Sequence, residues 1–112
     1  MSSNSEAITN EEKSEGIIDL DFHQVRKAFL ILRSLNHELR QKIISIISES
    51  KRTTVTEIYK KLNIEQSIVS QHLALLRKAG ILKTEKNKKY IYYSINSEKV
   101  KLISDCINEF MK

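Results

Sequence analysis

At 112 residues the chain has room for one ordinary domain, and a hydrophobic fraction of 40% is enough for a modest core. Proline is absent and only two glycines occur, which argues against a loop-rich β protein and favours helices joined by short connections. The single cysteine excludes an intrachain disulfide and a multi-cysteine metal cage, and no stretch reaches the ~18 apolar residues of a membrane span, so we expect a cytoplasmic protein without a membrane partner.

Charge is unevenly distributed along the chain. The net charge is +5, yet residues 1–20 hold one lysine against five acidic residues, whereas residues 51–101 hold twelve Lys or Arg against four Glu. Residues 1–18 are also poor in apolar side chains, so we expect a flexible acidic tail there, followed by a single domain over residues 19–112. The basic middle of the chain is where a polyanion would bind.

Apolar residues at helical spacing predict two helices at the start of the domain. The first begins after Asp19 or Asp21, either of which could cap it, and ends near Leu35. Asn36 is the expected N-cap of the second helix, which should end at a polar break over residues 48–52.

A short capped helix and a longer helix come next, with a tight turn between them. Thr54 followed three residues later by Glu57 matches the capping box at the start of the third helix, and the turn is expected at residues 63–64. The fourth helix is predicted over residues 65–79, and Gly80 stands where a helix end favours a left-handed residue.

Two runs of β-favouring residues follow the fourth helix. They predict strands over residues 81–85 and 89–95, joined by a polar turn at residues 86–88, which makes a β-hairpin with a basic tip. A final helix begins after Asn96 or Ser97. The predicted fold is therefore mainly α with a small β-hairpin, a winged helix-turn-helix in the element order α-α-α-α-β-β-α.

This order of elements is typical of proteins that lay a helix in the major groove of double-stranded DNA. The first turns of the fourth helix carry side chains that can pair with base edges, the start of the third helix could receive a phosphate, and the hairpin is lysine-rich. The alternatives are an ordinary solvated helix face, simple capping by the threonines, and lysines that guard a strand edge. The residues expected to contact DNA are Thr53, Thr54, Gln66, Ser67, Ser70, Gln71, His72, Arg77, Lys86, Lys88 and Lys89.

The apolar stripes of the first and last helices exceed what so small a body can easily cover. We expect them to pair across a two-fold axis in a homodimer, although packing within the monomer alone is the alternative. The residues expected at this interface are Phe22, Val25, Phe29, Leu32, Val100, Ile103, Ile107 and Phe110.

The run SIVSQHLALLRKAGIL, residues 67–82, together with the strand-like run 90–95, resembles the recognition helix and wing of the ArsR/SmtB family of winged-helix repressors. The likeness covers about residues 20–111. It implies a homodimer that sits on a palindromic operator in double-stranded DNA and represses transcription until an effector releases it. The sequence does not identify the effector.

The metal ligands of the metal-sensing members of that family are missing here. The helix before the predicted recognition helix lacks their cysteine pair and reads Thr56-Glu57-Ile58-Tyr59, and the last helix has Asp105 and Glu109 but no histidine. A transition-metal site needs three or four converging ligands of the soft or imidazole type. We therefore expect no metal site and no cofactor.

Two other classes of function compete with DNA binding as explanations of this sequence. A winged-helix adaptor for protein interaction or dimerisation that does not read DNA sequence would explain the basic hairpin, but it would more naturally show an apolar patch than the polar face at Ser67, Ser70 and Gln71. For catalysis the sequence offers no Ser-His-Asp order, glycine-rich phosphate loop or convergent acid pair, so we expect no enzyme.

Overall fold

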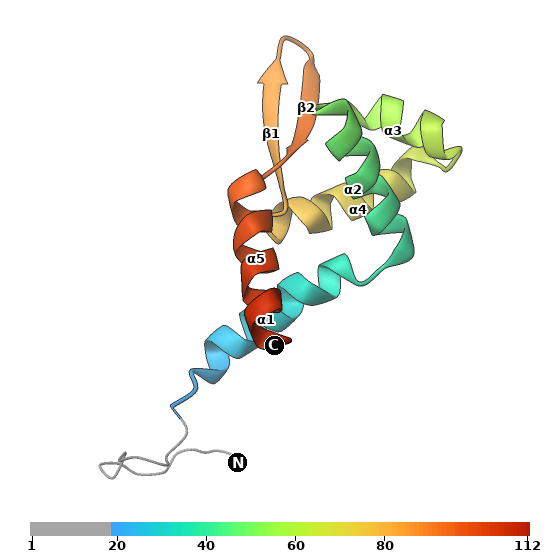
Figure 1. The fold of residues 1–112 in the computed structure, drawn as a ribbon. Coiled ribbons are helices and arrows are strands. Elements are labelled where there is room, and N and C mark those ends of the chain that lie inside the picture. Colours follow the sequence, from blue (N-terminus) through green and yellow to red (C-terminus); the bar gives the residue numbers. More distant parts are fainter. Residues whose placement is uncertain (1–18) are drawn as a thin grey trace.

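The computed structural model describes residues 19–112, which form five helices and one two-stranded antiparallel hairpin (Figure 1). The predicted acidic tail, residues 1–18, lies outside the described residues. The order of helices and strands is the predicted one. The elements are α1 (Phe22–Leu35), α2 (Glu38–Ser50), α3 (Val55–Leu62), α4 (Gln66–Lys78), β1 (Leu82–Asn87), β2 (Tyr90–Ile95) and α5 (Ser97–Phe110).

Local side-chain chemistry sets most of the helix ends. The carboxylate of Asp21 accepts a hydrogen bond from the backbone N–H of His23 at 3.0 Å and so caps α1. At α3 the predicted capping box is present, with Thr54 and Glu57 each bonded to the other's backbone N–H. Gly80 has a φ of +84°, the left-handed conformation that glycine adopts without steric cost, and α4 ends just before it.

The junction between α1 and α2 differs from the prediction. Asn36 is not the N-cap of α2, because its backbone N–H bonds to the carbonyl of Arg33 and it closes α1 instead. The cap of α2 is His37, whose Nδ1 accepts the backbone N–H of Leu39 at 3.1 Å. At its other end α2 continues through Ser50, into the predicted polar break.

The hairpin turn also lies further along the chain than predicted. The register pairs Asn87 with Tyr90, so residues 86 and 87 belong to the strand and the turn consists of Lys88 and Lys89. Lys88 takes the positive φ, +61°, that this two-residue turn requires.

A short bridge joins the hairpin to the segment that precedes α3. Thr53 pairs in antiparallel fashion with Tyr93 of β2, with N···O distances of 3.0 and 2.7 Å. The base of the wing is therefore held directly against the start of α3.

The core is small and lies between α2, α3, α4 and the start of β1. Each fully buried aliphatic side chain there contributes roughly 1.5–3 kcal/mol by leaving water. Neither α1 nor α5 contributes a buried apolar residue, and both lie at the end of the molecule away from the hairpin tip (Figure 1). The buried apolar residues are Ile43, Ile47, Ile58, Val69, Leu73, Leu76, Ile81 and Leu82.

Candidate nucleic-acid interface

One side of α4 is exposed and almost entirely polar. Val69, Leu73 and Leu76 are fully buried and hold the opposite side of the helix against the core. At 3.6 residues per turn, the residues on the side of the helix opposite to these anchors project outward. This exposed strip, the α4 strip, consists of Ser67, Ser70, Gln71, Ala74 and Lys78.

Gln66 lies at the edge of the α4 strip, on the first residue of the helix. The first backbone N–H groups of a helix have no partner within the helix. Glu65, the N-cap, makes no side-chain bond to those of α4, so they can donate to a phosphate oxygen beside the strip. The amide of Gln66 and the backbone donors therefore face the same end of the surface.

The structure does not bring His72 together with the α4 strip. Its ring is half-buried and faces α2, where Nδ1 accepts a hydrogen bond from Nε of Arg40 at 3.1 Å. The ring centroid also lies 4.8 Å from that of His37. Burial lowers the pKa of His72, and the nearby His37 and Arg40 lower that pKa further. Contact between His72 and DNA stays a prediction, and its side chain already has a structural partner.

Thr53 requires a correction. Its side chain is only 2% exposed, and its hydroxyl donates to the carboxylate of Glu57 at 2.6 Å. A buried and already bonded hydroxyl cannot receive a DNA phosphate, so Thr53 links the wing to α3 instead. That bond, followed by the backbone bond from Thr54, lowers the pKa of Glu57.

Thr54 is half-buried and its hydroxyl accepts the backbone N–H of Glu57 at 3.3 Å. The ionised carboxylate of Glu57 thus occupies the start of α3, where a phosphate was expected to sit. Negative charge at that place repels a second anion. Capping accounts for Thr54, and its contact with DNA stays a prediction.

The tip of the hairpin is basic and exposed. Lys88 and Lys89 form the turn, and Lys86 lies in the second residue pair below them, opposite Ile91. The ammonium of Lys89 lies 5.5 Å from the ring centroid of Tyr90. The three lysines that were expected to bind DNA are therefore gathered at one end of the wing.

Sequence reasoning missed Arg52. Its guanidinium lies 4.2 Å from the centroid of the Tyr92 ring and 3.6 Å from the carboxylate of Glu85, at the flank of the wing. The bridge at Thr53 places it there, and nothing within residues 48–52 signals a partner forty residues later. This stacked arginine extends the basic surface of the wing toward α3.

Arg77 is exposed in the last turn of α4. It lies about three helical turns from Gln66 along the same edge of the α4 strip, in line with Ser70. Lys78 follows within the strip itself. Positive charge is thus present at the wing and at the end of α4, while the middle of the strip holds neutral polar side chains.

The apolar residues expected at a dimer interface are mostly uncovered. Phe22 is 71% and Phe110 is 85% exposed, an unusual state for side chains of this size. Ile103 is the exception, because it is half-buried and packs against the core of its own chain. The remaining residues expected at the interface are also exposed; they are Val25, Phe29, Leu32, Val100 and Ile107.

Within residues 19–112, no three His, Cys, Asp or Glu side chains come close enough together to hold a metal ion. His37 and His72 are neighbours but have no third such ligand beside them, His23 lies on α1, and Cys106 is exposed on α5. In the same part of the chain, no helix is long and apolar enough to cross a membrane.

Comparison with known proteins gives consistent results. The sequence profile described as bacterial regulatory protein, arsR family, matches residues 37–84, which run from the cap of α2 into β1. The transcriptional repressor PagR of Bacillus anthracis is 38% identical over 78 residues, which cover 70% of this chain and 78% of PagR. The transcriptional activator HlyU of Vibrio cholerae is 30% identical over 82 residues, covering 73% of this chain and 75% of HlyU.

Solved structures agree with the sequence comparison. The crystal structure of PagR superimposes with a TM-score of 0.63 at 33% identity, over 78% of this chain and 99% of PagR. Reduced HlyU from Vibrio cholerae gives a TM-score of 0.62 at 28% identity, over 80% and 93% of the two chains. An ArsR-like regulator from Rhodococcus, at 14% identity and a TM-score of 0.70 over 79% of this chain and 82% of the regulator, shares the fold.

Proposed function

This chain belongs to the ArsR family of bacterial regulatory proteins, and on that premise we propose that it is a transcriptional repressor that binds a palindromic operator as a homodimer. It is a DNA-binding transcriptional regulator with a winged helix-turn-helix fold, not an enzyme. The resemblance read from residues 67–95 is therefore confirmed.

The observation that carries the proposal is the α4 strip. Apart from Lys78, its side chains are short or amide-bearing, and B-DNA's major groove, about 12 Å wide, admits one helix in direct contact with base edges. Gln71 can bond to adenine through two atoms, and Ser67 and Ser70 can reach a base or a phosphate. Ala74 leaves room for the DNA to approach the middle of the helix.

The wing supplies contacts that do not depend on base sequence. With α4 in the major groove, the hairpin beside it carries Lys86, Lys88 and Lys89 toward the flanking sugar-phosphate chain. Arg52 adds a fourth donor group held in place by Tyr92, which limits the entropy lost on binding. These cations position the protein, whereas the α4 strip reads the sequence.

Homodimer formation is proposed on the basis of the uncovered apolar residues of α1 and α5. A two-fold axis through these helices would cover Phe22, Phe29 and Phe110 and would place two copies of α4 on one face of the dimer. Half-sites one helical turn apart, about 10–10.5 bp, would then receive the two helices. The operator would be palindromic because the protein is symmetric.

Repression is the finer part of the proposal. A dimer that covers an operator at a promoter excludes other proteins from the same DNA, and the relative PagR carries the name of a repressor whereas HlyU is named an activator. Whether the protein represses or activates can be tested with a reporter gene placed behind its operator, once that operator has been found by selection from a random duplex pool. Repression predicts higher expression when Gln71→Ala is introduced, and an activator would give lower expression. Gln24→Ala, a change at an exposed residue of α1, is the matched control and should leave reporter expression unchanged.

A further inference from the structure

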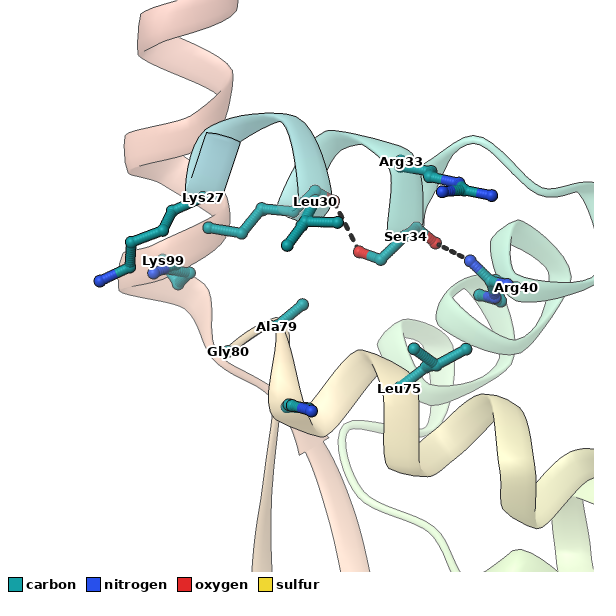
Figure 2. Close-up of a pocket in the computed structure, with 11 residues that line it drawn as sticks. Lys27, Leu30, Arg33, Ser34, Arg40, Leu75, Ala79, Gly80 and Lys99 are labelled. Carbon is teal, nitrogen blue, oxygen red and sulfur yellow. Dashed lines mark hydrogen bonds between the residues drawn. The ribbon is translucent and has the colours of Figure 1, made fainter. Parts of the chain in front are cut away.

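A groove of about 690 Å³ lies between α1 and the second half of α4, beside the start of α5 (Figure 2). Its walls are apolar, and the side chains of Leu30 from α1 and of Leu75 and Ala79 from α4 point into the space between the helices (Figure 2). Leu30 is 54% and Leu75 is 45% exposed, so both aliphatic chains lack a full complement of partners. The volume lies within the 300–1,000 Å³ typical of small-molecule sites.

The rim of the groove is strongly basic. It carries five cations and no carboxylate. Among residues 19–112, none of the five forms an ion pair, because the ion pairs found there involve other lysines and Arg52. The five are Lys27, Arg33, Arg40, Lys78 and Lys99.

One of these cations is held in place by a hydrogen bond. Arg40 donates to the backbone carbonyl of Ser34 at 3.0 Å, which keeps its guanidinium at the inner end of the groove (Figure 2). Lys99 crosses over Gly80, so closely that a Cβ added there would lie 3.3 Å from its Cε. An anion would therefore meet one charge that is already positioned, which reduces the ordering cost of binding.

We propose that the α1–α4 groove binds a small organic carboxylate with a hydrocarbon body. The apolar walls favour the hydrocarbon, and the uncompensated cations favour the carboxylate. Inorganic phosphate or a DNA phosphate would use the cations alone and leave Leu30 and Leu75 exposed to water. The combination of both surfaces in one groove therefore selects an amphipathic anion.

The groove and the phenylalanines of the proposed dimer interface use different sides of α1. Lys27, Leu30 and Ser34 form one stripe of α1, spaced three and four residues apart, whereas Phe22 and Phe29 lie on a different side of the helix. A partner that covers the phenylalanines would therefore contact α1 on a side away from the groove.

The position of the groove gives such a ligand a regulatory role, a step that rests on the proposed function. Its walls come from α1 and α5, which carry the proposed dimer contacts, and from α4, which carries the base-reading strip. A ligand that fits better when α4 is displaced relative to α1 would change the spacing of the two strips and hence operator affinity.

Calorimetric titration of the full-length protein without DNA tests the site. Because no DNA is present, a failure to bind the ligand can be distinguished from a failure of the proposed DNA binding. The probes are decanoate, decanol and inorganic phosphate. Decanoate is used below the concentration at which it forms micelles. We expect saturable binding of decanoate, at least about tenfold tighter than decanol or phosphate. Equal affinity for decanol, tighter phosphate binding, or no saturation by decanoate would overturn the proposal.

Paired variants locate the binding. Lys27→Gln with Lys99→Gln should weaken decanoate about tenfold, whereas Lys27→Arg with Lys99→Arg should retain binding because charge is kept. Lys42→Gln with Lys101→Gln, two exposed lysines away from the groove, is the matched control and should leave affinity unchanged. Leu30→Gln should weaken decanoate without affecting phosphate. Decanoate binding that survives both Lys27→Gln with Lys99→Gln and Leu30→Gln would place the ligand elsewhere.

Discussion

The Nε atom of Arg40 donates a hydrogen bond to Nδ1 of His72 across 3.1 Å, and the same guanidinium donates to the carbonyl of Ser34. This one side chain therefore joins the end of α1 and the start of α2 to the middle of α4. Nδ1 accepts a hydrogen bond only when it carries no proton, so the link requires neutral His72.

The first prediction concerns acid stability. The pKa of His72 is lowered from 6.5 by burial. Above that value His72 is neutral in the folded and unfolded chains alike. Below it the unfolded chain takes up the proton first, so the free energy of unfolding should fall as the pH drops through the folded pKa. His72→Asn keeps an acceptor near Nδ1 but does not titrate, and it should reduce that fall.

Urea midpoints at about pH 7.5 and about pH 5.5 measure this effect. His23→Asn, a change at an exposed residue of α1, is the control and should keep the pH dependence of the natural protein. Identical pH dependence in the His72 variant and the natural protein would mean that the Arg40 bond does not discriminate between the protonation states.

A second prediction follows from the burial of Thr53. Thr53→Val keeps the shape of the side chain but removes the hydroxyl that donates to Glu57, which should cost about 1 kcal/mol of stability. The pKa of Glu57, measured by NMR titration, should rise toward 4.5. Since a lowered carboxyl pKa stabilises the fold above 4.5 and that gain is lost as pH falls through the folded value, the variant should lose less stability on acidification.

The same variant distinguishes a structural role from DNA contact. The DNA affinity at a fixed salt concentration should be unchanged in Thr53→Val, because the side chain is not at the surface. Thr56→Val, at an exposed residue of α3, serves as the comparison and should leave stability within about 0.5 kcal/mol. Weaker DNA binding by Thr53→Val at that salt concentration, with binding by Thr56→Val unaffected, would restore the phosphate contact expected from the sequence.

The sequence predicted those features that depend on neighbours in the chain. The capping box of Thr54 and Glu57 and the helix end at Gly80 are set within four residues, and both were predicted correctly. Thr53 and His72 were assigned to the surface because their partners are distant. Tyr93 lies forty residues from Thr53, and Arg40 lies 32 residues from His72. Such partners follow from tertiary packing, which periodicity does not encode.

The hairpin shows a related difficulty in a local feature. A basic turn was predicted, but its position was wrong by about one residue because Lys88 takes the positive φ that Asn or Gly usually signals. The sequence also contains no sign of the position of Arg52, because its place beside Tyr92 depends on the final register of the strands.

The third prediction tests the wing. Each phosphate neutralised contributes about 0.9 to the slope of log affinity against log salt for duplex DNA. Lys88→Gln with Lys89→Gln should therefore reduce the magnitude of that slope by roughly 1.8 per wing, measured by fluorescence anisotropy over a salt series. Lys42→Gln with Lys101→Gln removes the same charge elsewhere and should leave the slope much closer to that of the natural protein. Equal reductions of the slope in the two double variants would mean that the wing lysines act only through the net charge of the protein and do not contact phosphates.

The fourth prediction tests the apolar surface of α1 and α5. Phe29→Glu or Phe110→Glu places a charge in the proposed dimer interface and should give a monomer by sedimentation. Both side chains are exposed within one chain, so the helical circular dichroism of the monomer should persist. Leu102→Glu is the control, because Leu102 is an exposed apolar residue on another side of α5 and its change should preserve the dimer. A dimer that survives both phenylalanine changes would require a different interface.

Selection of bound sequences from a random duplex pool tests the central claim most directly, with the natural protein and Gln71→Ala compared at one salt concentration. We expect a palindromic consensus whose half-sites are about 10–10.5 bp apart, and a relaxed preference at one base pair of each half-site in the variant. A pool that emerges without any enriched sequence, or an identical consensus from the two proteins, would contradict the assignment of base reading to the α4 strip.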